Sequence, residues 1–153
     1  NEVISIEFNG VSVSKDECPR EPDEDKIKSL DPAFIEGGSV TAASSSPISM
    51  GASALLVMSN KKCEELGYTP KFRVLSRAVA GVDWKTMGSG PLPATEKALK
   101  GAGLSMDDID FIELNEAFAS QVLAVLREWK LPDEDKLNVN GSGISLGHRI
   151  PLD

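Results

Sequence analysis

From Gly51 onward, short apolar runs alternate with helical patterns, and this alternation constrains the fold more than any other feature of the chain. It is typical of strands joined by helices that cross over onto a shared sheet. Strands are predicted over residues 52–58, 72–80, 109–114 and 137–140. Helices are predicted over residues 60–66 and 91–102, ended by Gly67 and Gly103, and from about Asn115 to Pro132. We therefore expect an α/β layer that is part of a larger sheet.

The helix that begins near Asn115 has the clearest pattern. Its apolar residues recur at helical spacing and fall on one face: Phe118, Val122, Val125, Leu126 and Trp129. A stripe of this kind predicts a face packed against the core.

Residues 1–38 have a different character. Ile4, Ile6 and Phe8 alternate with polar residues, as in a half-buried strand. An acidic run follows, which we expect to be a solvated surface: Asp16, Glu17, Glu21, Asp23, Glu24 and Asp25. This part of the chain is interpreted as a loop or subdomain segment.

Composition excludes several classes of function. The net charge of −8 disfavours nucleic acid and anionic membrane surfaces as partners. A single histidine and two cysteines are too few for a zinc site or a disulfide framework. No run approaches the roughly 18 apolar residues of a membrane span, and the start lacks the features of a signal peptide. We expect a soluble protein of the cytoplasm, or of an organellar matrix if the source is eukaryotic.

Two polar residues follow predicted strands, where ligands bind in α/β layers. Asn115 comes directly after residues 109–114, and His148 follows a glycine-rich turn after residues 137–140. An imidazole can act as a general base or oxyanion donor near neutral pH, and an amide can hold a water or a carbonyl oxygen. Each has a plainer explanation, because Asn is also a preferred helix N-cap and most histidines do no chemistry.

Other candidate motifs are weaker. The glycine-rich segments at residues 88–90 and 141–143 complete no nucleotide-binding fingerprint. The serines at 44–46 do not form a nucleophile elbow. Cys63 falls within a predicted helix rather than at its N-terminus, so packing explains it better than activation.

Four ordered segments resemble the thiolases: residues 40–47 (VTAASSSP), 87–91 (MGSGP), 115–119 (NEAFA) and 140–148 (NGSGISLGH). The resemblance spans residues 14–148. It implies a thiolase-like layered α/β fold with a mixed sheet and covering helices. Residues 1–48 would be the end of the loop domain that binds coenzyme A, and residues 49–153 an incomplete C-terminal half.

The resemblance also implies an activity and a set of site residues. Thiolases exchange acyl groups between coenzyme A thioesters through a cysteine acyl-enzyme. His148 would activate that cysteine and donate to the oxyanion, and Asn115 would position the water that donates the second hydrogen bond. Two groups of residues match family positions that line the ligand. The pantetheine and adenine site would be lined by Phe34, Ala42 and Ser46. The acyl pocket would be lined by Met87, Ala117 and Phe118. Coenzyme A thioester is thus the implied substrate, with no permanently bound cofactor or metal.

The departures from the family pattern are equally informative. Cys18 and Cys63 match neither family cysteine, and residues 149–153 depart from the family's sequence after the histidine. Both ends look cut, so the first hypothesis is a thiolase fragment that is inactive without an N-terminal half. In its full-length context the family resemblance implies a dimer or tetramer. The alternatives are a non-catalytic coenzyme A-binding or scaffold module, and a structural remnant with no ligand.

Overall fold

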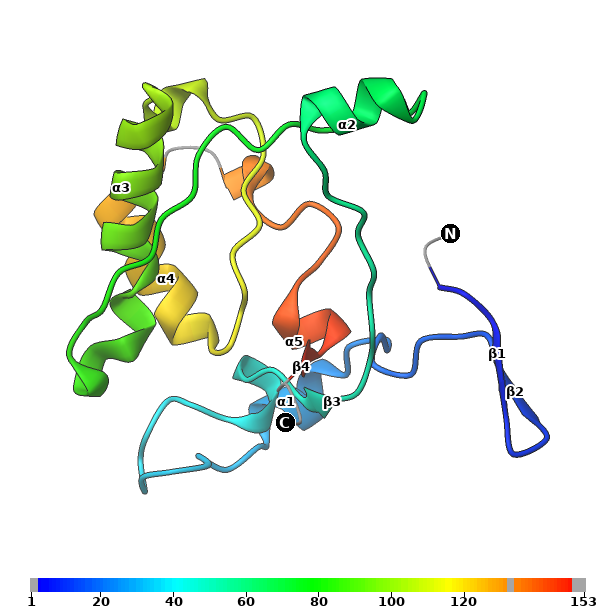
Figure 1. The fold of residues 1–153 in the computed structure, drawn as a ribbon. Coiled ribbons are helices and arrows are strands. Elements are labelled where there is room, and N and C mark those ends of the chain that lie inside the picture. Colours follow the sequence, from blue (N-terminus) through cyan, green and yellow to red (C-terminus); the bar gives the residue numbers. More distant parts are fainter. Residues whose placement is uncertain (1–2, 132–133, 150–153) are drawn as a thin grey trace. The chain divides into compact units, whose positions relative to one another are not determined.

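The computed structural model describes residues 3–131 and 134–149 (Figure 1). Its contacts divide the chain into two compact units, one of Asn1–Met50 with Phe111–Asp153 and one of Gly51–Asp110. The expected end of the third helix at Pro132 and most of the tail after His148 lie outside the described residues. No helix in the described part has the length and apolar character needed to cross a membrane.

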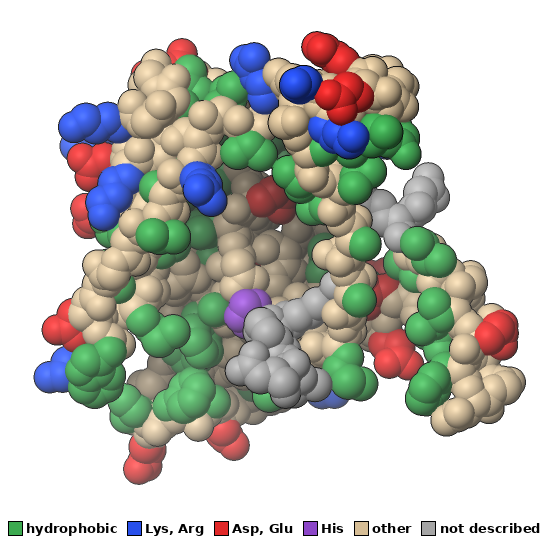
Figure 2. All heavy atoms as spheres, viewed as in Figure 1, with side chains coloured by type: hydrophobic (Ala, Val, Ile, Leu, Met, Phe, Trp, Pro, Cys, Tyr) green, Lys and Arg blue, Asp and Glu red, His purple; other side chains and the backbone are tan. Residues whose placement is uncertain are grey.

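The first unit begins with a hairpin of β1 (Ile6–Phe8) and β2 (Val11–Val13), paired antiparallel. Asn9 and Gly10 form its turn with φ of 49° and 76°, the conformation that a two-residue hairpin turn requires. The predicted strand is therefore present, but the prediction that it is half-buried is wrong. The apolar side chains of both strands are exposed, and Figure 2 shows green side chains on this hairpin.

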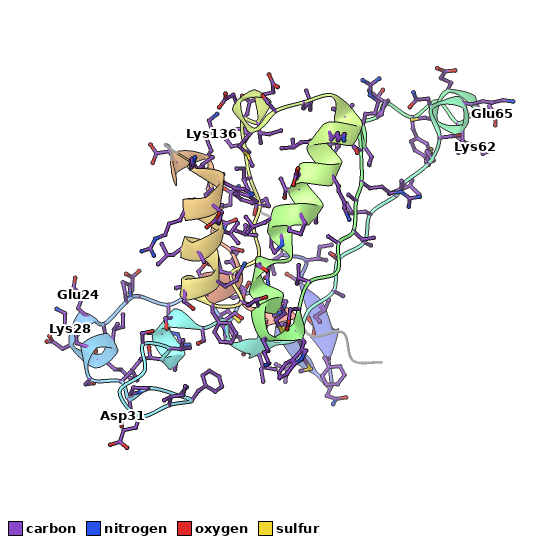
Figure 3. All side chains as sticks on the ribbon, turned by 90° about the vertical axis from the view of Figure 1, so that its left-hand side faces the viewer. Glu24, Lys28, Asp31, Lys62, Glu65 and Lys136 are labelled. Carbon is purple, nitrogen blue, oxygen red and sulfur yellow. The ribbon has the colours of Figure 1, made fainter. Side chains whose placement is uncertain are left out.

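The acidic run is exposed throughout, as predicted. It leads into α1 (Glu24–Lys28), which Asp23 caps by accepting a hydrogen bond from the Lys26 amide. Lys28 and Glu24 form an exposed ion pair at 3.1 Å, which contributes little to stability. Figure 3 shows the two side chains beside each other on α1.

The core of the first unit lies along α4 (Ala119–Trp129). Val122, Val125 and Leu126 are buried on its predicted apolar face, and Leu114 is buried with them in the same unit. The prediction that this helix starts near Asn115 is wrong by about one turn, since Phe118 is its N-cap. Residues 117 and 118 are instead paired with residues 45 and 46, which holds them outside the helix.

The second unit contains α2 (Asn60–Glu65), η2 (Trp84–Ser89) and α3 (Pro91–Ala102). Both α-helices agree with the sequence prediction. Gly67 and Gly103 follow them with a φ of 70° each, the left-handed stop that glycine favours. Figure 3 shows Lys62 beside Glu65 on α2, another exposed ion pair.

The last turn of the second unit is η3 (Met106–Asp108), which follows Ser105. Hydrogen bonds from the Ser105 backbone and hydroxyl hold the pKa of the Asp108 carboxyl below its ordinary value. A depressed carboxyl pKa stabilises the folded state at neutral pH, and this contribution is lost as the pH falls through the folded-state pKa.

The predicted strands are the main correction to the fold. Residues 52–58 and 72–80 form no strand, and except for the half-buried Met58 their large apolar side chains are exposed, Leu55 by 90% and Phe72 by 93%. Residues 109–114 and 137–140 form a single parallel bridge, between Ile112 and Leu137, in place of two full strands. A strand needs backbone partners, and the described residues provide none for the two long runs.

Candidate functional site

The 45–49 segment connects the two places where sequence analysis puts chemistry. At one end Ser45 forms an antiparallel bridge with Phe118. Ser46 donates to the Ala117 carbonyl twice, from its backbone amide at 3.0 Å and from its hydroxyl at 3.2 Å. The segment then continues into β3 (Ile48–Ser49), which pairs parallel with β4 (His148–Arg149). A single short stretch of backbone therefore holds both Ala117 and His148.

The turn before this segment is η1 (Ala42–Ser44), a single helical turn capped by Thr41. The Thr41 amide donates to the Ser44 hydroxyl at 3.0 Å, and the Ser45 hydroxyl donates to the Thr41 carbonyl at 2.8 Å. The Ser44 and Ser45 hydroxyls therefore form hydrogen bonds with the backbone of Thr41, which agrees with the absence of a nucleophile-elbow sequence. Ala42 lies exposed at the start of the turn.

Two aromatic rings meet where Phe118 pairs with Ser45. The Phe34 ring contacts the Phe118 ring edge to face, with centroids 6.2 Å apart and planes at 76°. Both are partly open, Phe34 being 73% exposed and Phe118 37%. Phe34 is presented by a loop that the Ala33 amide closes through a hydrogen bond to the Val40 carbonyl at 2.8 Å. The structure therefore brings Phe34, Ser46, Ala117 and Phe118 together as an apolar patch with polar backbone nearby.

His148 is held through its backbone. Its amide donates to the Pro47 carbonyl at 3.2 Å, and it pairs with Ile48 in the β3–β4 register. The side chain is half-buried, and Figure 2 shows the histidine in purple on the face in view. Gly147 precedes it with a φ of 91°, and a Cβ there would contact Ser49 and lie 3.1 Å from the Cys18 sulfur. Only glycine fits this approach to His148.

Asn115 follows the buried Leu114 and is exposed. It does not cap α4, so the plainer explanation of this residue is wrong. A Cβ on Gly143 would lie 3.0 Å from the Asn115 Oδ1 and 2.9 Å from the Glu116 carbonyl oxygen. Residues 115 and 116 therefore pack directly on the start of α5 (Gly143–Leu146), the short helix that leads into His148.

Two further residues belong to this site and were not predicted from the sequence, Glu116 and Asn138. The Asn138 side chain is buried and pairs with both backbone groups of Leu114, and Glu116 bonds both Asn138 and the Ile144 amide. An asparagine in a predicted strand was the available signal. Its partners are 22 or more residues away in sequence, so local residue spacing could not predict these hydrogen bonds.

Met87 lies in the second unit, in η2, and is 78% exposed. Its proposed place in the acyl pocket stays a prediction. Among the described residues, no group of three or more His, Cys, Asp or Glu side chains is arranged to hold a metal ion.

Comparison with known proteins gives the family. Residues 1–61 match the thiolase N-terminal domain and residues 68–152 the thiolase C-terminal domain. The chain is 52% identical over 159 residues to the 3-ketoacyl-CoA thiolase of Marinomonas sp. (strain MWYL1), which covers 98% of this chain and 41% of that protein. These matches show an α/β fold of the thiolase type, and the chain belongs to the thiolase family.

Solved structures agree. The crystal structure of the Bacillus anthracis acetyl-CoA acetyltransferase superimposes with a TM-score of 0.88 at 46% identity, over 95% of this chain and 38% of that one. The crystal structure of human mitochondrial 3-ketoacyl-CoA thiolase in complex with CoA superimposes with a TM-score of 0.86 at 42% identity, over 90% of this chain and 35% of that one. The predicted thiolase-like fold is confirmed, although the chain spans only about two fifths of the length of these relatives.

Proposed function

We propose that this chain carries the coenzyme A-binding segment and the Asn115 and His148 part of a thiolase acyl-transfer centre. The observation that carries the proposal is the 45–49 segment, which joins the Ala117 loop to His148 within one unit. Residues 1–48 serve as the end of the loop domain and residues 49–153 as part of the C-terminal half.

The hydrogen bonds that His148 and Asn115 can provide determine which step of acyl transfer they support. A thiolate attacks the thioester carbonyl carbon and forms a new C–S bond, while the carbonyl oxygen takes the negative charge. The His148 imidazole N–H and a water held by the Asn115 amide stabilise that oxyanion, and donors fixed before the charge develops are the most effective. Collapse of the intermediate breaks the old C–S bond, and the coenzyme A thiolate leaves with the proton that the His148 imidazole took from the attacking cysteine thiol.

The attacking thiolate comes from outside this sequence. Cys63 is buried, and its thiol donates to the Tyr68 carbonyl at 3.2 Å. Cys18 is half-buried with its sulfur packed near Gly147, and it matches no family cysteine. The chain by itself therefore binds the thioester without turning it over. The rest of a thiolase chain is the partner that completes the site, in a dimer or tetramer of the cytoplasm or an organellar matrix.

Calorimetric titration of the chain with coenzyme A tests the binding half of the proposal. Ser46→Ala removes the hydroxyl that donates to the Ala117 carbonyl, and we expect affinity for coenzyme A to fall about fivefold, the effect of one hydrogen bond of about 1 kcal/mol. Ser39→Ala is the matched control, because Ser39 is exposed and has no hydrogen bond within the described residues. Equal affinities for the two variants, or no binding by the unsubstituted chain, would contradict the proposal.

A further inference from the structure

A buried asparagine extends the contact between residues 112 and 137 by side-chain pairing. Asn138 has only 9% of its surface exposed. Its Oδ1 accepts from the Leu114 amide at 2.8 Å, and its Nδ2 donates to the Leu114 carbonyl at 2.8 Å. The amide thus satisfies both backbone groups of Leu114, the residue directly before Asn115.

Glu116 connects this pair to the turn that carries His148. One carboxylate oxygen accepts from Asn138 Nδ2 at 3.1 Å and the other from the Ile144 amide at 3.2 Å. Ile144 lies at the start of α5, two residues before its end at Leu146. The Ser142 hydroxyl adds a bond to the Leu114 carbonyl at 3.0 Å. These bonds link both residues that flank Asn115 to α5.

Asn115 itself depends on these neighbours. Its side chain is exposed and makes no hydrogen bond with any described residue, so nothing of its own fixes its position. Its position relative to α5 follows from Leu114, Glu116 and the close approach of Gly143. Catalytic donors must be held to within roughly 0.5 Å, and a buried, charge-assisted network is suited to that task.

We propose that Glu116 is a positioning residue, oriented by Asn138, that holds Asn115 and the turn before His148 in register for acyl transfer. This rests on the function proposed above for Asn115 and His148. The contribution of Glu116 is geometric, because its two oxygens are occupied by Asn138 and Ile144 and have no part in the reaction.

The test replaces Glu116 in the full chain with an isosteric residue that has one acceptor fewer. Asn138 and Ile144 donate to different oxygens of Glu116, so in Glu116→Gln the single remaining oxygen can take only one of these two places, and the amide nitrogen in the other place cannot accept. We expect amide exchange at Ile144 to rise at least fivefold. We also expect the NMR signals of the Asn115 side-chain amide and the His148 ring to shift, with a melting temperature within about 4 °C of the unsubstituted chain.

A second variant separates positioning from general loss of structure. Glu116→Asp keeps both carboxylate oxygens on a side chain that is shorter by one methylene, so one oxygen can still accept from Asn138 and the other from the Ile144 amide. Protection of the Ile144 amide should then lie between that of Glu116→Gln and that of the unsubstituted chain. Glu113→Gln is the matched control, since Glu113 is exposed in the same loop and has no hydrogen bond within the described residues.

The proposal is overturned if Glu116→Gln leaves Ile144 exchange and the Asn115 and His148 signals the same as in Glu113→Gln. The proposal is also overturned if the Asn115 and His148 signals shift only together with signals from the rest of the chain, because that pattern indicates a general loss of structure. Failure of the unsubstituted chain to bind coenzyme A would count against the proposed function but would not alter these exchange rates. The two failures are therefore distinguishable.

Discussion

Leu126→Ala is expected to lower the free energy of unfolding of the first unit by about 2–5 kcal/mol, the usual effect of truncating a buried leucine. Leu126 is 8% exposed, on the face of α4 that also buries Val122 and Val125. This is a large fraction of the stability of an ordinary domain, and the described part of the unit has few other buried apolar side chains. Urea denaturation followed by circular dichroism measures the change.

Leu123 provides the control on the same helix. It is 50% exposed, so Leu123→Ala removes an identical group from a site that is half in water. We expect a loss of less than about 1 kcal/mol. Equal losses from the two substitutions would mean that α4 does not pack as described.

Gly147→Ala is expected to cost about 3 kcal/mol and to disrupt the β3–β4 pairing that holds His148. Two effects add. The φ of 91° with a ψ of 144° is a conformation that only glycine adopts readily, and the new methyl group would contact Ser49 and the Cys18 sulfur. The His148 ring signals in an NMR spectrum should shift or broaden as the pairing is lost.

Gly37→Ala separates the two effects. Gly37 belongs to the same unit and has a φ of 69°, but nothing lies within 4 Å of its Cβ position. Its substitution should cost about 1–2 kcal/mol from backbone strain alone and leave the His148 signals in place. If the two glycine variants behaved alike, the close contact at Gly147 would have no role in holding His148.

Local signals predicted the helices well. Residues 91–102 were predicted and observed as α3, because Pro91 at the first position and Gly103 after the last are signals carried by the chain itself. The stripe predicted α4, but the predicted start is too early, since residues 115–118 have a helical pattern. Residues 117 and 118 pair with residues 45 and 46, about 70 positions away, and this pairing holds them outside the helix.

Strands were predicted less well for a related reason. Residues 52–58 and 72–80 have the composition of buried strands, but a strand exists only where another strand pairs with it. The described residues contain no partner for either run, and both are exposed. Composition therefore predicts that these runs are apolar but not that they pair, and the chain spans only about two fifths of the length of its thiolase relatives.

The site was predicted in part. Asn115 and His148 were chosen because they follow strand-like segments, and the structure links both to the same short helix, α5. Phe34, Ser46, Ala117 and Phe118 were chosen by family resemblance and lie together. Glu116 and Asn138 could not be found in this way, because their importance lies in hydrogen bonds between segments far apart in sequence.

The most direct test of the central claim is acetoacetyl-CoA thiolysis by a chimera. Residues 1–153 would replace the matching segment of the Bacillus anthracis acetyl-CoA acetyltransferase, which supplies the remaining part of a thiolase chain. We expect sustained turnover from the folded chimera, none from the 153-residue chain alone, and none from the chimera with His148→Ala. Sustained turnover by the chain alone, or a folded chimera that binds coenzyme A without turnover, would contradict the claim, and the second result would favour a non-catalytic binding module.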